Sequence, residues 1–335
     1  MARNQRIFYA CQSVAIAPRG TEPTAAHIVH GLQSVGMSST FTLDQVFEMG
    51  QIEIYENVEE VADIEVTLEK VIDGYKLLFD LASNGNCKTS LVSASKTRSD
   101  VYLAIFDDGL SHATGVPRNV CMNSGLFVSS VSYNYSVDGS ATESVTLVGN
   151  DRFWNTSHGV LGSDPTTLWG TDNISTNIDG TDTPLSGVVR RTDVDLSAST
   201  IPAEVKNNGG DDSGDNNFHV QSIAVSTDLG QENIQELGRF GPYTRYATFP
   251  IEVTCEFEVI ATSGDLISVS GNAPNLVDRT ITIKDTAGTV ISLGDKNKLS
   301  SVSYSGGDTG GGNSTVTYSY SNFNDLTVDG GAAHA

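Results

Sequence analysis

The sequence predicts a mainly β protein in which one domain occurs twice in tandem. Three observations lead to this: sequence blocks that recur in one order, a composition rich in turn-forming residues, and segments whose apolar residues alternate with polar ones. Alternation with a period of two is typical of half-buried strands. The predicted fold class is therefore antiparallel sheets of the β-sandwich or barrel-forming kind, with one short helix in each copy.

The repeat is clearest between QSVGMSSTFTLDQVFEMG at 33–50 and QSIAVSTDLGQENIQELG at 221–238, which align without a gap. Further blocks follow in the same order, namely IEVTLE with IEVTCE, FVSSVSY with KLSSVSY, and SVTL with TVTY. A unit of this length far exceeds the roughly 20–50 residues of solenoid and propeller repeats. Two copies of a whole domain explain the conserved order better than the alternative, two β-rich halves that share only a composition.

The repeat sets the expected domain boundaries. Residues 33–150 form the first copy and 221–335 the second, which ends in a flexible tail, DGGAAHA. Residues 1–32 are expected to form an N-terminal arm or extra strand, because QSVAIA at 12–17 echoes the start of each copy. Residues 151–220 form an Asn-, Asp-, Gly- and Ser-rich insertion or linker. Its aromatic residues indicate partial packing on a neighbour; they are Phe153, Trp154 and Trp169.

Composition and charge restrict the function. The 33 glycines and the 18% of charged residues fit a turn-rich β protein. A formal net charge of −22 argues against a protein that grips nucleic acid through its phosphates. No apolar stretch approaches the roughly 20 residues of a membrane helix, so no membrane partner is expected. The cysteines have no C-x-x-C spacing, and Cys255 replaces Leu68 of the first copy, which predicts a small buried side chain.

Each copy is expected to hold an acidic strand preceded by a short helix. In IEVTLE the apolar Ile64, Val66 and Leu68 should face one side and the polar residues the other, and IEVTCE follows the same pattern. Before each acidic strand stand LDQVFEMG and QENIQELG, whose apolar residues three apart and closing glycine predict one to two helical turns.

No catalytic, metal or cofactor site is predicted. His27 and His30 lie three apart but lack a Glu-x-x-His or H-E-x-x-H context, so a surface or packing role is favoured. The GGDDSGD loop at 209–215 lacks the spacing of a calcium-binding EF loop. No serine lies in a nucleophile elbow beside a histidine, and enzymatic activity is therefore expected to be absent.

One acidic run stands out, because it carries a single basic residue, Lys70. Such a run is either the solvated side of a sheet or a surface that repels another negatively charged molecule. Its acidic members are Glu53, Glu56, Glu59, Glu60, Asp63, Glu65, Glu69 and Asp73.

The block SSTFTLDQVFEMGQIEIYENVEEVADIEVTLEKVIDGY resembles a segment of tailed-bacteriophage structural proteins, and the whole chain resembles a tail tube protein of the duplicated-domain type. The resemblance covers the two repeat units. It implies stacked rings in which a sheet from each domain lines a continuous β-barrel channel. Most tube proteins resemble one copy and form hexamers, whereas certain tubes are trimers of duplicated subunits. The run at 151–215 has no counterpart in the minimal fold.

The resemblance implies a structural virion component of the tail, made in the host cytoplasm, whose acidic lumen conducts DNA during ejection without binding it specifically. It also implies self-association into stacked rings, with a homotrimer expected and a hexamer as the alternative, and sheath, tape-measure and tail terminator proteins as possible partners. The competing interpretation is another virion β-module: a capsid decoration, adhesin or carbohydrate-binding protein. The expected lumen-facing residues are Glu65, Thr67, Glu69, Glu252, Thr254, Glu256 and Glu258.

Overall fold

The structure is a computed structural model that describes residues 6–330 except 22, 24, 85–87, 109–116, 155–186, 210–218, 273, 275, 308, 310 and 311. Cys87, Trp169, most of the 151–220 insertion and most of the C-terminal tail therefore lie outside the described residues.

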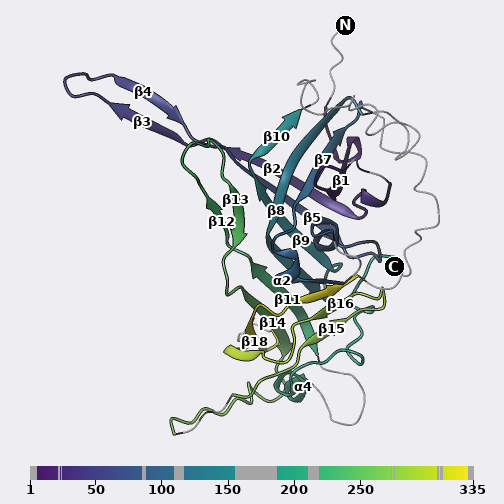
Figure 1. Cartoon of the computed structure of the whole chain (residues 1–335). Coiled ribbons are helices and arrows are strands. Elements are labelled where there is room, and N and C mark those ends of the chain that lie inside the picture. The colour runs from purple at the N-terminus through teal and green to yellow at the C-terminus, as the bar shows by residue number, and fades with distance from the viewer. Residues whose placement is uncertain are drawn as a thin grey trace.

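The body of the chain is an antiparallel sheet that runs from top to bottom of Figure 1. Its main path has the strand order β17-β18-β14-β11-β8-β9-β5-β2. The mainly β, antiparallel fold class is thereby confirmed. The strands of the path are β2 (Leu32–Thr40), β5 (Asp63–Val71), β8 (Asn119–Ser136), β9 (Thr142–Gly149), β11 (Val220–Asp228), β14 (Glu252–Ile260), β17 (Lys298–Ser305) and β18 (Thr315–Phe323).

The recurring sequence blocks take the same places in both halves of this path. The first half has the order β2-β5-β9-β8 and the second half β11-β14-β18-β17. The bulges recur as well: the β2–β5 pairing shifts between Leu32 and Ser34, as the β11–β14 pairing does between Val220 and Ser222. The β8–β9 pairing shifts between Val128 and Ser130, and the β17–β18 pairing shifts between Leu299 and Ser301.

The acidic strands differ in register by two residues from the sequence alignment. Ser34 lies opposite Glu69, and its counterpart Ser222 lies opposite Glu258 rather than Glu256. An even shift leaves every side chain on its original face of the sheet, so the alternation is preserved. The two halves meet where β8 pairs with β11, with Tyr133 opposite Val225.

The prediction of a short helix before each acidic strand is wrong. The first segment forms a β-hairpin of β3 (Leu43–Phe47) and β4 (Ile54–Glu59), and the second a hairpin of β12 (Gln231–Ile234) and β13 (Thr244–Ala247). The glycines that were assigned to helix ends, Gly50 and Gly238, have φ of 98° and 86° in the hairpin loops. The apolar pairs three apart fit a strand followed by a turn, and eight residues are too few for a helix to form without tertiary support.

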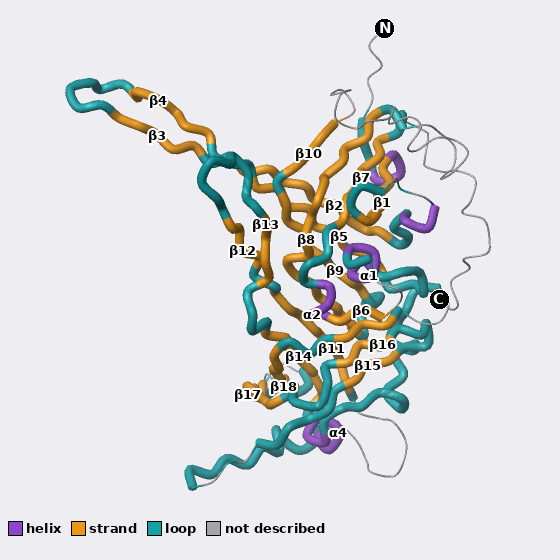
Figure 2. The backbone as a smooth tube through the Cα atoms, viewed as in Figure 1, coloured by secondary structure: helices purple, strands orange, loops and turns teal. Residues whose placement is uncertain are grey.

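The smaller elements extend the sheet or pack on its apolar face (Figure 2). β1 forms where an additional strand was expected and pairs with β7, which in turn pairs with the first part of β8, as β10 also does. A four-stranded sheet has the order β15-β16-β19-β6. The bounds are β1 (Gln12–Pro18), β6 (Lys88–Ser90), β7 (Ser99–Ile105), β10 (Asp151–Trp154), β15 (Thr282–Lys284), β16 (Val290–Ser292), β19 (Thr327–Asp329), α1 (Leu78–Ala82), α2 (Leu91–Ala94) and α4 (Ala203–Gly209).

The apolar face of the main sheet is the core of the protein. Val66, Leu68, Val253 and Phe257 are fully buried there, and so is Cys255, as its exchange with leucine predicted. The described part of the insertion also packs on this side, because Val189, Ile201 and Val205 are buried in the same cluster. Burying a side chain of this size stabilises the fold by about 1.5–3 kcal/mol.

Glu143 of β9 is a buried carboxylate on the apolar side of the sheet. It accepts hydrogen bonds from the backbone N–H groups of Leu78 and Phe79, at 2.6 and 3.0 Å, and from the Tyr133 hydroxyl at 3.0 Å. The group therefore ties the start of α1 to the sheet. Burial raises the pKa of Glu143 to about 7, although the nearby Lys70 ammonium and these hydrogen bonds oppose the shift.

Because the folded protein holds this proton more tightly than the unfolded chain, the contribution of Glu143 to stability is lost as pH rises from 4.5 to 7. We expect the free energy of unfolding of the native protein, relative to Glu143→Gln, to fall by on the order of 3 kcal/mol across that window. Asp195→Asn is the control, because hydrogen bonds from Ser197 and Ala198 lower the pKa of Asp195 from 3.8, away from the window. Urea titrations at several pH values measure the free energy of unfolding of the native protein relative to each variant. A difference from Glu143→Gln that does not change with pH would contradict the raised pKa of Glu143.

Candidate functional site: a polar sheet face between two open edges

The face of the main sheet opposite the core is lined by hydroxyl and carboxylate side chains. Because paired residues of adjacent strands share a face, one cross-strand row can be followed from edge to edge. That row consists of Ser34, Glu69, Ser144, Ser132, Ser226, Thr254, Ser321 and Lys298. The neighbouring rows continue the pattern with Thr67 beside Thr146, and Glu256 between Ala224 and Ser319.

The seven residues expected to face a lumen all lie on this polar face. Glu65, Glu252 and Glu256 are exposed, and the other four are half-buried between their neighbours. Along the eight strands, the acidic members of the face are Asp63, Glu65, Glu69, Asp228, Glu252, Glu256 and Glu258, and Lys298 is the only basic one. The face is therefore negative across both halves. Its assignment to a lumen remains a prediction.

The carboxylates on this face are held by hydroxyl groups. Ser34 Oγ donates to Glu69 Oε2 at 3.4 Å, and its counterpart Ser222 Oγ donates to Glu258 Oε2 at 3.2 Å. Ser319 Oγ donates to Glu256 Oε1 at 3.1 Å. No basic side chain among the described residues forms an ion pair with these three glutamates. The negative charge therefore remains available to repel an anion.

The main sheet ends in two strands that lack an outer partner among the described residues, β2 and β17. Side chains that point toward the core at these edges are incompletely covered: Val35 and Met37 are half-buried, and Tyr304 is 53% exposed. An edge strand presents unpaired N–H and C=O groups that can pair with another chain. Both edges are therefore candidate association surfaces.

The β3–β4 hairpin projects away from the body of the chain, as the upper left of Figure 1 shows. Every residue of both strands is exposed. The apolar side chains left uncovered on the hairpin and its flanks are Phe41, Leu43, Val46, Phe47, Met49, Ile52, Ile54, Tyr55 and Val58. Exposed apolar side chains gathered on one hairpin make it a candidate interaction site.

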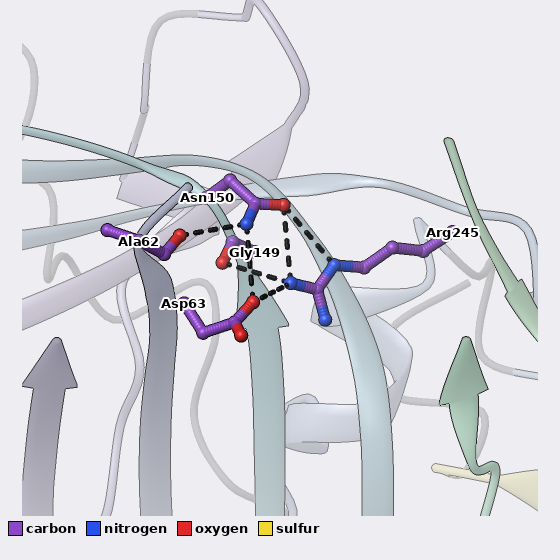
Figure 3. A network of polar contacts seen from close by, with 5 residues as sticks. All are labelled: Ala62, Asp63, Gly149, Asn150 and Arg245. Atoms are coloured by element: carbon purple, nitrogen blue, oxygen red, sulfur yellow. Dashed lines mark hydrogen bonds and ion pairs between the residues drawn. The ribbon is translucent and has the colours of Figure 1, made fainter. Parts of the chain in front are cut away.

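The β12–β13 hairpin, in contrast, is fastened to the first half of the chain through Arg245 (Figure 3). The Arg245 guanidinium lies 2.6 Å from Asp63 Oδ1 at the start of β5, and it also donates to the Asn150 side chain and to the Gly149 carbonyl. Asn150 Nδ2 in turn donates to the Ala62 carbonyl at 2.8 Å. Arg245 is 7% exposed, whereas the Asp63 side chain is 60% exposed, so the guanidinium is shielded from water and the carboxylate is not.

The two histidines weighed as metal ligands make other contacts. His27 lies in a short 3-10 helix, and burial together with the Lys76 charge lowers its pKa. His30 stacks on the ring of Tyr75, with centroids 4.2 Å apart. Across the described ranges, no three His, Cys, Asp or Glu side chains gather as metal ligands would. In the same part of the chain, no helix is long and apolar enough to cross a membrane.

Two features of the site were missed by the sequence analysis. The serines and threonines of SSVSY, TVTYSYS and QSIAVST alternate with apolar residues, which could have revealed that the polar face spans all eight strands. The Arg245 network had no local signal, because Asp63, Asn150 and Arg245 come together only through tertiary contacts.

Comparison with known proteins gives structural neighbours, two of which resemble the chain weakly. No family model matches the chain, and no curated protein matches its sequence. A chain of the anti-feeding prophage baseplate is 15% identical with a TM-score of 0.32, covering 44% of this chain and 95% of that one. A chain of the anti-feeding prophage cap, a tube-terminating cap, is 13% identical with a TM-score of 0.34, covering 46% and 93%. At such TM-scores the likeness carries no argument about function.

We expect Arg245→Met to loosen the β12–β13 hairpin, because Asn150 and the buried Gly149 carbonyl lose a donor whose side chain is itself buried, at a cost of about 1–3 kcal/mol. Arg239→Met is the matched control in the same hairpin: Arg239 is half-exposed and lies 3.8 Å from Glu236. Its removal is expected to change stability by less than about 0.5 kcal/mol. Chemical denaturation and hydrogen exchange over 231–247 measure both, and equal effects would show that the network does not hold the hairpin.

Proposed function

We propose that the chain is a structural protein of a tailed-bacteriophage virion that forms the tail tube, as stacked rings with an acidic β-barrel lumen. One observation carries the proposal: a long antiparallel sheet with a continuous negative polar face has its core elements on the other face and open strands at both ends. Joining such sheets edge to edge removes the open edges and encloses the polar face. The sequence resemblance to tail tube proteins points to the same assembly.

The polar face suits a conduit for DNA. A protein that binds DNA tightly neutralises phosphates with basic side chains and thereby releases counterions. This face carries almost no basic side chains. Carboxylates presented by Glu65, Glu69, Glu252, Glu256 and Glu258 would instead keep the duplex away from the wall. The role we propose is thus mechanical and electrostatic, without catalysis, cofactor or metal.

A homotrimeric ring is the assembly that we favour. Each chain supplies two four-stranded units of the same strand order, so three chains would give a ring of six similar units. We propose that these units are tandem copies of one domain. A hexamer with the second unit outside the barrel is the alternative. Sheath, tape-measure and tail terminator proteins are proposed partners of the assembled tube.

Electron microscopy of the purified protein in negative stain tests the proposal directly. Tubes of uniform bore, or rings with an open centre, are the expected result. Isolated monomers at high protein concentration would instead favour a decoration, adhesin or carbohydrate-binding module.

We expect the double variant Glu65→Lys, Glu252→Lys to assemble but to retain DNA, because its lumen would offer basic side chains to the phosphates. Co-sedimentation of labelled duplex DNA with the tubes should rise roughly tenfold or more at low salt and fall steeply as salt increases. The control Asp138→Lys, Asp151→Lys makes the same charge change outside the eight-strand path. Equal DNA retention by the two variants, or retention unchanged from the native tube, would reject the lumen assignment.

A further inference from the structure

We infer that the interface between two copies of this chain repeats the pairing of β11 with β8 inside one chain, which we call the internal seam. In this arrangement β2 of one copy pairs with β17 of the next in the register that β11 keeps with β8, and the β3–β4 hairpin lies over the second half of that neighbour. The inference gives the proposed ring its contact between chains. Closure of the chains into a ring rests on the proposed function, whereas the pairing of β2 with β17 is argued from the internal seam.

The internal seam buries the residues on both of its sides. Val225 of β11 lies opposite Tyr133 of β8, and both are 1% exposed. Just beyond β11, the backbone N–H of Leu229 donates to the Ser129 carbonyl at 2.7 Å, at the bulge of β8. The Leu229 side chain is fully buried.

The counterparts of these residues at the open edges are uncovered. Tyr304 stands in the second half where Tyr133 stands in the first, within the shared motif SSVSY, and it is 53% exposed. Met37, the counterpart of Val225, is half-buried, and Phe41, the counterpart of Leu229, is 72% exposed. Each of these side chains lacks the cover that its counterpart obtains from the other half of the chain.

The shared bulges fix the register expected between copies. Inside the chain, Ser226 lies opposite Ser132, and Asp228 lies opposite Ser130. Transferred to the open edges, Ser38 falls opposite Ser303 of the neighbour and Thr40 opposite Ser301. Met37 then falls opposite Tyr304, so the two uncovered side chains bury each other. By the same transfer, the Phe41 N–H donates to the Ser300 carbonyl of the neighbouring copy. Ser300 is the residue at the bulge of β17.

The two hairpins follow the same relation. β12–β13 lies against the first half, where Gln231 Nε2 donates to the Val128 carbonyl at 2.8 Å and Arg245 binds Asp63. The corresponding hairpin, β3–β4, is not covered by any described segment of its own chain and exposes its apolar side chains instead. Asn57 occupies the place of Arg245, so the hairpin is expected to bind the neighbour chiefly through apolar contacts, with exposed Phe323 beside Glu252 at the receiving site.

Disulfide formation between introduced cysteines tests the register. The variant that carries Ser38→Cys and Ser303→Cys should cross-link chain to chain under mild oxidation. Ser38 and Ser303 lie on the two end strands of the path, roughly 30 Å apart along the sheet, so a bond within one chain is excluded. A second in-register pair, Thr40→Cys with Ser301→Cys, guards against local disturbance by the first, and the single variants control for the native thiols.

The matched control is Ser38→Cys with Ser305→Cys, which moves one cysteine two residues along the same face. Diagonal neighbours lie roughly 7–8 Å apart, with their Cβ atoms somewhat closer, whereas directly opposite Cβ atoms lie roughly 4.5–5.5 Å apart, much nearer the roughly 3.5–4.5 Å that a disulfide spans. The in-register pairs are expected to cross-link about tenfold faster than this control. The cross-linked species should end at a closed ring, and a ladder that stops at three chains supports the trimer.

The outcomes separate this inference from the proposed function. If tubes form but the Ser305→Cys pair cross-links as fast as the in-register pairs, the inference is overturned while the tube remains. If in-register cross-links form and micrographs show only open chains of molecules, the seam is supported and the tube is rejected.

Discussion

The pairing of β8 with β11 is the contact on which the rest of the molecule depends. It joins two four-stranded units into one sheet, it buries tyrosine and valine side chains from both, and it places the β12–β13 hairpin against the first unit. Without it, both units would present a further open edge. The same contact leaves one pair of strand edges and one hairpin covered within the chain, and another pair of edges and another hairpin open to a second molecule.

Alternation along the strands assigns each side of the sheet its chemistry. Apolar residues at every second position pack against the helices and small strands, and the residues between them give a face of hydroxyls and carboxylates. The two-residue difference in register between the acidic strands leaves this division intact, because an even shift never exchanges the faces. Substitutions within the polar face can therefore alter its charge with little effect on the core.

The sequence predicted most strands of the main sheet, the buried Cys255 and the common face on which the glutamates lie. These follow from local periodicity, which the final fold preserves. It did not predict the hairpins, because LDQVFEMG and QENIQELG satisfy a short helical pattern as well as a strand and a turn, and the choice is made by pairing with β4 and β13. Nor could it place Arg245 on Asp63, since 182 residues separate the two along the chain.

The length of β8 has a consequence for how the chain folds. Its first part pairs with β7 and β10 and its second part with β9 and β11, with Gly125 at a φ of 67° where the partners change. During synthesis β8 emerges well before β11, so a nascent first half carries an uncovered strand until about eighty further residues follow. While the intervening region is synthesised, the nascent chain therefore presents the β11 side of β8 as an open strand edge that can pair with another chain.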